Sequence, residues 1–385
     1  MSKPGRMAQR SLPILFLFLT FASATACSVR RGSDPITTSG DGWDTASLRS
    51  AGFGEGALSQ LTQEIKAGKF PNTHAVLIEH DGYLVYEQYF DGTDERWGQP
   101  LGHRHFDCDS LHDLRSVSKS VTSLVLGIVL GGKYASALET PLPFFFPNLT
   151  MAPEFRAIRL HHALTMTAGI EWNEMTVPYS NETNDEIRLY GVTDPVASVL
   201  MRPVLEAPGS KWYYNGGLTQ VLAGIVQGMA GNSLDRVAAD VLFTPLGITK
   251  FEWLGSTLWD PPIPAAMSGL RMRARDLAKI GSVCLHGGKW KGQQIVPKEW
   301  LERSMQRHVK RAGAWSNGGL WGYGYQFWVG GFPQGYEVVA ARGNGDQNVF
   351  ILQREHLVVT IFAGAYNRYN GYSERILHRI MAARN

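Results

Sequence analysis

A serine and a lysine separated by two residues carry the clearest chemical signal of this chain. Ser116 and Lys119 form its only Ser-x-x-Lys and stand just ahead of a long apolar run. A serine hydroxyl is a poor nucleophile at neutral pH and needs a base within hydrogen-bond reach. Residues at i and i+3 share a helix face, and burial disfavours the charged form of an ammonium group. The pair therefore predicts a nucleophile and its base, with a helix N-cap at Ser116 and a solvated Lys119 as the alternative.

The elements that must position this pair can be read from apolar spacing. The run at 121–132 predicts a buried helix that ends at its two glycines. Helical spacing predicts a helix over 54–69, and the runs 74–80 and 83–90 flank Asp81-Gly82, a strong hairpin signal. Further helices are expected at 159–168, 194–201, 218–229, 233–243, 274–285 and 372–383, and further strands at 324–329, 336–342, 347–353 and 357–363.

Strands at both chain ends with helices between them predict an α+β fold. We expect one antiparallel sheet flanked by terminal helices, with a mostly helical region inserted. The corresponding division is a sheet domain over 46–133 and 289–385 and a mostly helical domain over 134–288.

The first 26 residues have the pattern of a cleavable signal peptide. Basic residues precede a short apolar core over 12–21, and small residues at 24–26 precede a cleavage point. Cys27 follows and resembles the lipid-bearing cysteine of bacterial lipoproteins, with ordinary secretory cleavage at Ala26 as the alternative. A polar tether is expected over 27–45. Ser28, where aspartate would favour the inner membrane, indicates an outer-membrane lipoprotein that faces the periplasm.

Composition and charge exclude several classes of protein. The 385 residues are 44% hydrophobic and carry 37 basic and 34 acidic side chains. Removal of residues 1–26 takes away three basic residues and no acidic one, so nothing indicates a nucleic-acid partner, and membrane contact is expected only through the lipid. Cys108 and Cys284 are left either as a disulfide or as two buried thiols, and their spacing matches no metal motif.

Five segments resemble, in order, the signatures of one superfamily. They are 115–123 (RSVSKSVTS), 164–170 (LTMTAGI), 208–215 (PGSKWYYN), 269–278 (GLRMRARDLA) and 341–347 (ARGNGDQ). Together they resemble the serine β-lactamase and penicillin-binding-protein superfamily, in particular its class C-like serine hydrolases and esterases, from Trp43 to the C-terminus. The flanks of the first segment are also similar to those of 6-aminohexanoate-dimer hydrolases.

The resemblance implies acyl transfer without a metal or cofactor. Ser116 would attack the carbonyl of a small-molecule ester or amide, while Lys119 and a tyrosine exchange the proton. The oxyanion would lie between the Ser116 N–H and a strand N–H near Gly345 or Asp346. Water would then hydrolyse the acyl-enzyme.

Two tyrosines compete for the acid–base role. Tyr213 fits the letters Tyr-x-Asn with Asn215, whereas Tyr214 lies at the family's usual distance after Pro208 and is favoured. A nearby ammonium group is expected to lower the pKa of that phenol from about 10.

The last segment departs from penicillin-active relatives, which carry Lys-Thr-Gly there. Arg342 could replace that lysine as a partner of a substrate carboxylate or could point away, which favours esters and linear amides over β-lactams. A β-lactamase or D-amino-acid peptidase of the same fold is the alternative. The residues expected to contact substrate are Tyr213, Asn215, Arg342, Asn344 and Trp172.

Three rivals need other residues or no chemistry. The motif His103-x-His105-x-Asp107, with His112-Asp113 close behind, could hold zinc, yet no later cluster completes such a site. A Ser-His-Asp hydrolase lacks its Gly-x-Ser-x-Gly elbow. A catalytically idle ligand-binding domain of the cell envelope is the third.

Overall fold

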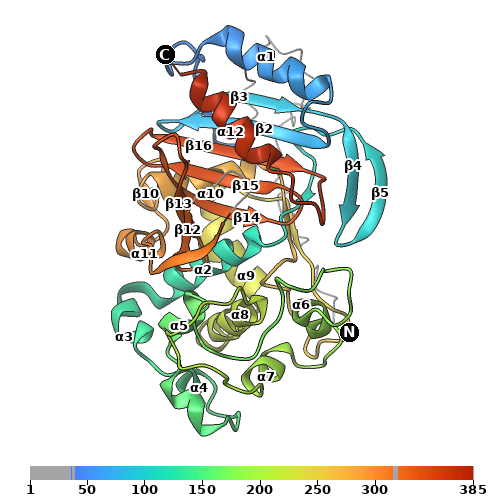
Figure 1. Cartoon of the computed structure of the whole chain (residues 1–385). Helices are drawn as coiled ribbons and strands as arrows, with labels where there is room; N and C mark the ends of the chain where they lie inside the picture. Colours follow the sequence, from blue (N-terminus) through green and yellow to red (C-terminus); the bar gives the residue numbers. More distant parts are fainter. Residues whose placement is uncertain (1–35, 37–39, 315–319, 385) are drawn as a thin grey trace, which may run out of the picture.

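One nine-stranded sheet organises the residues that the computed structural model describes, namely 36, 40–314 and 320–384. Its order is β1-β3-β2-β16-β15-β14-β13-β12-β11, with antiparallel neighbours apart from the parallel pair β1 and β3. The two chain ends meet where β2 pairs with β16 (Figure 1). The strands are β1 (Asp44–Thr45), β2 (Thr73–His80), β3 (Tyr83–Tyr89), β11 (Val309–Ala314), β12 (Leu320–Tyr323), β13 (Trp328–Gly331), β14 (Glu337–Gly343), β15 (Gln347–Leu352) and β16 (Leu357–Ala363).

The β2–β3 hairpin forms as its sequence predicts. Asp81 and Gly82 have φ angles of 49° and 88°, the left-handed pair that a type I′ turn requires. All of β2 except His80 is buried, because helices cover both faces of the sheet.

Terminal helices cover one face of the sheet and two internal helices cover the other. α1 (Glu55–Lys66) and α12 (Tyr372–Ala382) contact each other, and α12 crosses in front of the strands in Figure 1. α10 (Ala274–Leu285) packs behind β15, β16 and β2, and α2 (Val117–Leu130) packs against β14. The expected antiparallel sheet flanked by terminal helices is confirmed.

The helical half lies below the sheet in Figure 1. Its centre is α8 (Gly216–Ala230), which contacts α2 and most of its neighbours in this half. The other helices are α3 (Tyr134–Leu138), α4 (Leu142–Phe145), α5 (Leu160–Leu164), α6 (Asp185–Leu189), α7 (Pro195–Leu200), α9 (Leu234–Ala238) and, beside the sheet, α11 (Lys298–Ser304). The short strands are β4 (Gly92–Arg96), β5 (Gln99–Arg104), β6 (His112–Asp113), β7 (Phe251–Trp253), β8 (Leu270–Met272), β9 (Lys289–Trp290) and β10 (Gln293–Gln294).

Two expected boundaries differ from the packing. The tether expected over 27–45 ends earlier, because Trp43 is buried, donates to the carbonyl of Arg275, and leads into β1. The helical domain expected over 134–288 includes α10, which packs on the sheet instead. By its contacts, the inserted helical half therefore ends before α10.

The strand expected at 324–329 is wrong over 324–327, and only its last two residues belong to a strand, β13. Gln326 has a φ of 63° and turns the chain between β12 and β13, while its side-chain amide donates to the carbonyl of Leu164. An aromatic buried loop gave the same apolar signal as a strand. The disulfide between Cys108 and Cys284 does not form, because Cys284 is a free buried thiol.

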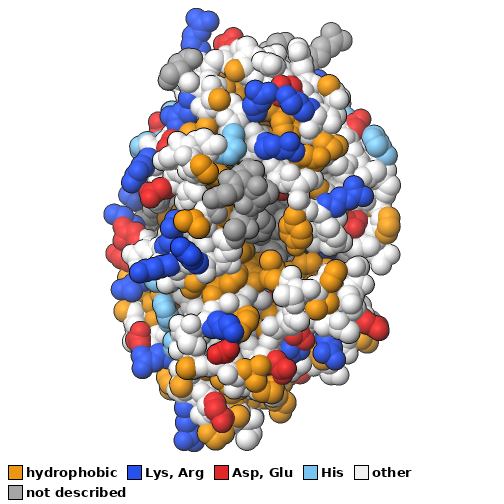
Figure 2. All heavy atoms as spheres, in the orientation of Figure 1, with side chains coloured by type: hydrophobic (Ala, Val, Ile, Leu, Met, Phe, Trp, Pro, Cys, Tyr) orange, Lys and Arg blue, Asp and Glu red, His pale blue; other side chains and the backbone are white. Residues whose placement is uncertain are grey.

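Among the described residues, one segment has the length and apolar character of a membrane span. It runs from Val117 to Leu138 with a mean hydropathy of 1.5, but 56% of it is buried inside the protein. This segment begins with α2, the core helix that carries Lys119. Figure 2 shows hydrophobic side chains gathered across the middle of the drawn face, with basic and acidic side chains intermixed elsewhere.

Candidate active site

Ser116 lies where a strained loop enters α2. The preceding residue, Arg115, has a φ of 49°, which is uncommon for a residue with a side chain. Ser116 occupies the N-cap position, yet its side chain makes no capping hydrogen bond. The alternative in which the Ser116 hydroxyl caps the helix is therefore wrong, and this hydroxyl is free for another interaction.

Lys119 lies directly beneath that hydroxyl. Its Nζ donates to Ser116 Oγ at 3.0 Å, to the carbonyl of Met267 at 2.9 Å and to Glu186 Oε2 at 3.3 Å. Three acceptors match the three hydrogens of an ammonium group. The lysine is 1% exposed, so the predicted pair is brought together in a buried position with Lys119 held as a cation.

Tyr214 completes the group around Ser116. It is buried, it lines the same cleft as Ser116, and the centre of its ring lies 4.9 Å from Lys119 Nζ. Burial, and then the charge of Glu174, raise the pKa of the Tyr214 phenol well above 10, and the hydrogen bond with Ser116 offsets this only in part. The expected lowering of this pKa by an ammonium group is therefore wrong.

Tyr213 and Asn215 lie elsewhere. The Tyr213 hydroxyl donates to Glu206 at 3.4 Å, and its side chain lines a separate surface cavity. Asn215 caps α8 by accepting from the N–H of Leu218 at 2.9 Å. Of the two tyrosines, the one at the family distance from the proline faces the serine.

Two buried carboxyl groups beside Lys119 escaped the sequence analysis. Glu186 comes from α6 and Glu174 from the loop before it, and Glu174 Oε1 lies 3.8 Å from Lys119 Nζ. Glu174 accepts from Trp172 Nε1 at 2.8 Å and from the N–H of Gly216 at 2.7 Å. Neither acid belongs to a sequence motif or to a periodic apolar pattern. Only the folded structure therefore identifies them.

Burial and the neighbouring Glu186 charge raise the pKa of Glu174 to about 8. For Glu186, burial alone would raise the pKa, but Lys119 and hydrogen bonds from its neighbours hold it below its ordinary value. Both carboxyls lie within 4 Å of the same Lys119 Nζ, at 3.8 Å and 3.3 Å.

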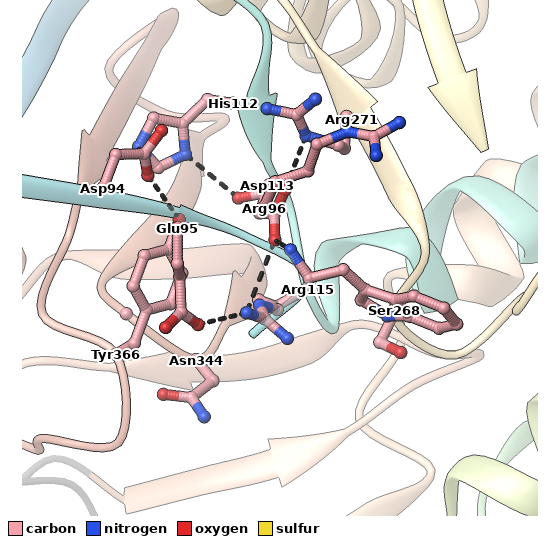
Figure 3. Close-up of polar contacts among 12 residues, drawn as sticks. Asp94, Glu95, Arg96, His112, Asp113, Arg115, Ser268, Arg271, Asn344 and Tyr366 are labelled. Carbon is pink, nitrogen blue, oxygen red and sulfur yellow. Dashed lines mark hydrogen bonds and ion pairs between the residues drawn. The ribbon is translucent and has the colours of Figure 1, made fainter. Parts of the chain in front are cut away.

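Ser116 lines two spaces. A narrow cleft of about 50 Å³ is walled by Tyr214, Trp328, Asn344 and Tyr369 among others. A wider cavity of about 560 Å³ is lined by both polar and aromatic side chains. Figure 3 shows part of its wall, where Arg115 lies between Glu95 and Asp113, with Asn344 and Ser268 nearby.

Comparison with known proteins identifies the family of this chain. A sequence model described as Beta-lactamase matches residues 60–375. The chain belongs to the Beta-lactamase family. A 6-aminohexanoate-dimer hydrolase of Paenarthrobacter ureafaciens is 26% identical over 268 residues, which is 66% of this chain and 66% of that relative, just under two thirds of each.

Solved structures of the family share the fold at low identity. A penicillin-binding protein homologue of Caulobacter crescentus has a TM-score of 0.65 at 15% identity, over 85% of this chain and 97% of that one. A D-stereospecific amidohydrolase of Streptomyces sp. has a TM-score of 0.60 at 15% identity, over 84% of this chain and 98% of that one. Two of the matches to this Beta-lactamase family member are named as hydrolases, the Paenarthrobacter ureafaciens relative and the Streptomyces amidohydrolase.

The segment 341–347, the last of the five family-like segments, lies against the loop that precedes Ser116. A side chain at Gly343 would clash with the Leu114 carbonyl, which a Cβ there would approach to 2.2 Å. Asn344, Gly345 and Asp346 line the narrow cleft with Ser116. The segment therefore lies close enough to offer a backbone N–H to a substrate there, as the family resemblance implies.

The side chains of this segment are committed to the protein. Arg342 forms a 2.8 Å ion pair with Glu374 on α12. Asn344 exchanges hydrogen bonds with Asn367, and Asp346 accepts from Ser373 Oγ at 2.9 Å.

Trp172 was expected to contact substrate, but it lines neither space around Ser116. Its indole N–H holds Glu174, and the Arg202 guanidinium lies 4.6 Å from the centre of its ring. This aromatic residue therefore supports the buried acid pair.

The suggested zinc motif does not assemble. His103 and His105 are exposed on and after β5, and the Asp107 carboxylate accepts from Ser110. Among the described residues, one group could hold a metal, His74, Asp94 and His112. Its two imidazoles are already joined by a 2.8 Å hydrogen bond between His74 Nδ1 and His112 Nε2.

Proposed function

We propose that this protein is a serine hydrolase that cleaves an ester or amide through an acyl-enzyme on Ser116. The observation that supports it best is the 3.0 Å contact between Lys119 Nζ and Ser116 Oγ at the base of a cleft. A nucleophile with an acid–base partner in hydrogen-bond reach is the signature of covalent catalysis.

The steps follow from this geometry. Ser116 Oγ attacks the carbonyl carbon as its proton passes toward Lys119, and the oxyanion accepts from the Ser116 N–H and from a backbone N–H of the 344–346 segment. The tetrahedral adduct collapses when a proton reaches the leaving group, for which the Tyr214 phenol is the nearest donor on the cleft side. Water then repeats the sequence on the acyl-enzyme.

The cleft favours a substrate with an apolar part and no obligatory carboxylate. Met175 and Tyr369 at its wall are 51% and 66% exposed, so they offer apolar contact at the mouth. Arg342, the counterpart of the lysine in penicillin-active relatives, is paired with Glu374. Esters and linear amides therefore fit better than β-lactams.

One observation supports the β-lactam or D-amino-acid substrates as a second candidate. Arg368 lines the narrow cleft and is exposed, so a cation is available to a carboxylate even though Arg342 is engaged. A panel of nitrophenyl esters, 6-aminohexanoate dimer, D-amino-acid amides and nitrocefin separates the two. Turnover of nitrocefin with a kcat/KM above that of the esters would reverse the order.

Replacement of the nucleophile tests the proposal itself. Ser116→Ala should abolish ester hydrolysis and covalent labelling by a fluorophosphonate while the melting temperature stays near that of the wild type, because the hydroxyl caps no helix. Ser118→Ala, two residues away, removes a different buried hydroxyl and should keep labelling. Wild-type protein that does not label would support the idle ligand-binding domain instead.

For the location we propose a lipoprotein held by Cys27 on the periplasmic side of the outer membrane. Cys27 and the signal pattern lie outside the described residues, so the sequence alone supports this. Two acyl chains on one cysteine would anchor stably where one would not.

A further inference from the structure

The floor of the site contains more negative than positive charge. Lys119 is one cation, whereas Glu174 and Glu186 are two carboxyl groups, with side chains 0% and 6% exposed. An unbalanced buried charge is costly, and a carboxyl pair relieves it by binding a proton. The two carboxyls converge at Gly216, where a Cβ would lie 2.6 Å from Glu186 Oε2 and 3.1 Å from Glu174 Oε2, so one proton can be shared between them.

Lys119 connects this pair to the nucleophile. Its Nζ is 3.0 Å from Ser116 Oγ on one side and 3.3 Å from Glu186 Oε2 on the other. Because Lys119 already holds three hydrogens on three acceptors, it can take the Ser116 proton only by giving one away. The Met267 carbonyl cannot accept a proton, so the carboxylate is the acceptor that remains.

We propose that the Glu174–Glu186 pair is the proton acceptor of the acylation step and is reached through Lys119. The inference rests on the proposed function, since it concerns how Ser116 is activated. As the bond from Ser116 Oγ to the acyl carbon forms, the Oγ–H proton moves to Lys119 Nζ and a Lys119 proton moves to Glu186 Oε2. Collapse of the adduct takes a proton from the Tyr214 phenol to the leaving group, and the pair returns its proton through Lys119 to restore that phenol, so the pair ends as it began.

Hydrogen bonds fix the positions of both carboxyl groups, so the pair can gain or lose a proton without moving. Glu174 Oε1 accepts from Tyr179 at 2.8 Å, and Glu186 Oε1 accepts from Tyr190 at 3.2 Å. A methyl group on Gly216 would come within 2.6 Å of Glu186 Oε2, so the glycine makes room for the carboxyls. Both acids act on Ser116 through Lys119.

The direction of the pH dependence follows from this arrangement. When Glu174 is protonated, the pair can accept a further proton only on Glu186, whose low pKa makes it a weak base. When Glu174 has lost its proton, the pair is a stronger base, because the pKa of Glu174 is about 8. The rate should therefore rise with pH through about 8 and level off above it. On the rising limb of this profile, below about pH 8, kcat/KM should fall about tenfold for each pH unit, as protonation of a single group requires.

Other titratable groups around the pair do not account for such a limb. Burial raises the pKa of each facing phenol above its ordinary value, and for Tyr190 the charge of Arg115 offsets this only in part. The facing groups are Lys119, Tyr179, Tyr190, Tyr214, Tyr323 and Tyr369.

The test is the pH dependence of fluorophosphonate labelling and of nitrophenyl ester kcat/KM from pH 6 to 10. Labelling isolates the first step and needs no knowledge of the natural substrate. Wild type should show the limb near 8, and Glu174→Gln and Glu186→Gln should lose it and fall by about 10²–10⁴ in kcat/KM at pH 9. Glu171→Gln, an exposed acid three residues from Glu174, should keep the wild-type profile.

Each outcome decides the matter. A wild-type profile without the limb overturns the inference even if the variants do not fold, and so does a folded Glu174→Gln that keeps the limb. A variant that loses rate equally at all pH values would show a structural role only. If Ser116→Ala is inactive and these profiles still contradict the pair, the inference fails while the proposed function stands.

Discussion

Lys119 on α2 and Lys279 on α10 are both buried helix lysines, yet their surroundings differ in charge. Lys279 is 0% exposed and pairs with Asp276 Oδ1 at 3.0 Å. Asp276 also accepts from Arg273, which reaches Asp109 at 3.2 Å, so two cations face two carboxylates. Lys119 instead faces two carboxyls alone and also touches a hydroxyl at the cleft.

The comparison separates a buried charge that stabilises from one that can react. A balanced cluster needs no proton to reach neutrality and offers no reason to exchange one. Around Lys119, neutrality requires a proton on the acid pair, and that proton has a path to Ser116. Burial of a lysine is thus a poor sign of function, whereas buried imbalance beside a nucleophile is a good one.

The largest expected effect comes from removing each lysine in turn. Lys119→Met should lower kcat/KM by about 10²–10⁴, the usual range for a lost acid–base group, and Lys119→Arg should not restore it because arginine keeps its proton. Lys279→Met should keep kcat/KM within about twofold while lowering the free energy of unfolding, by up to about 3–5 kcal/mol if Asp276 is left poorly paired. Nitrophenyl ester kinetics and chemical denaturation measure the two effects.

The opposite ranking would break the comparison. A Lys279→Met protein that folds but loses activity as Lys119→Met does would mean that burial, and not charge imbalance, marks the important lysine.

The two tyrosines sharpen the same comparison at the level of one hydroxyl. Tyr214→Phe keeps the ring beside Lys119 but removes the hydrogen bond with Ser116, so turnover should fall by about 10²–10⁴. Tyr213→Phe removes only a 3.4 Å contact with Glu206 and should change turnover by less than about threefold. Equal loss in both variants would show that Tyr213 reaches the substrate from its neighbouring cavity.

Much of the fold could be predicted because it depends on local signals. The hairpin at Asp81-Gly82, the helix at 274–285 and the strand at 357–363 follow from turn chemistry and apolar period, and the structure has them there. The run at 324–329 misled because buried aromatic residues look alike in a strand and in a packed turn. Local sequence does not predict which elements pack together, such as α10 and the sheet.

The site divides along the same line. Ser116, Lys119 and Tyr214 stand in ordered motifs, and the structure brings them together as the motif order implies. Glu174 and Glu186 come from irregular sequence and meet Lys119 only through folding of the 172–186 segment. Sequence spacing fixes neighbours on one helix, whereas charge balance in a buried pocket depends on where separate segments converge.

A change outside both lysine clusters should have the smallest effect on catalysis. Cys27→Ser is expected to leave kcat/KM unchanged, because it takes no part in the proposed chemistry, and to move the enzyme from the membrane fraction to the soluble one. The chemistry that competes with a lipid is a disulfide, since a sulfur of Cys27 that carries diacylglycerol cannot also bond to another cysteine. Detergent phase partitioning and intact mass of the unreduced wild type distinguish them. A wild-type protein in the aqueous phase, without lipid mass and two hydrogens lighter than its reduced form, would replace the anchor with a disulfide and leave the comparison of the two lysines intact.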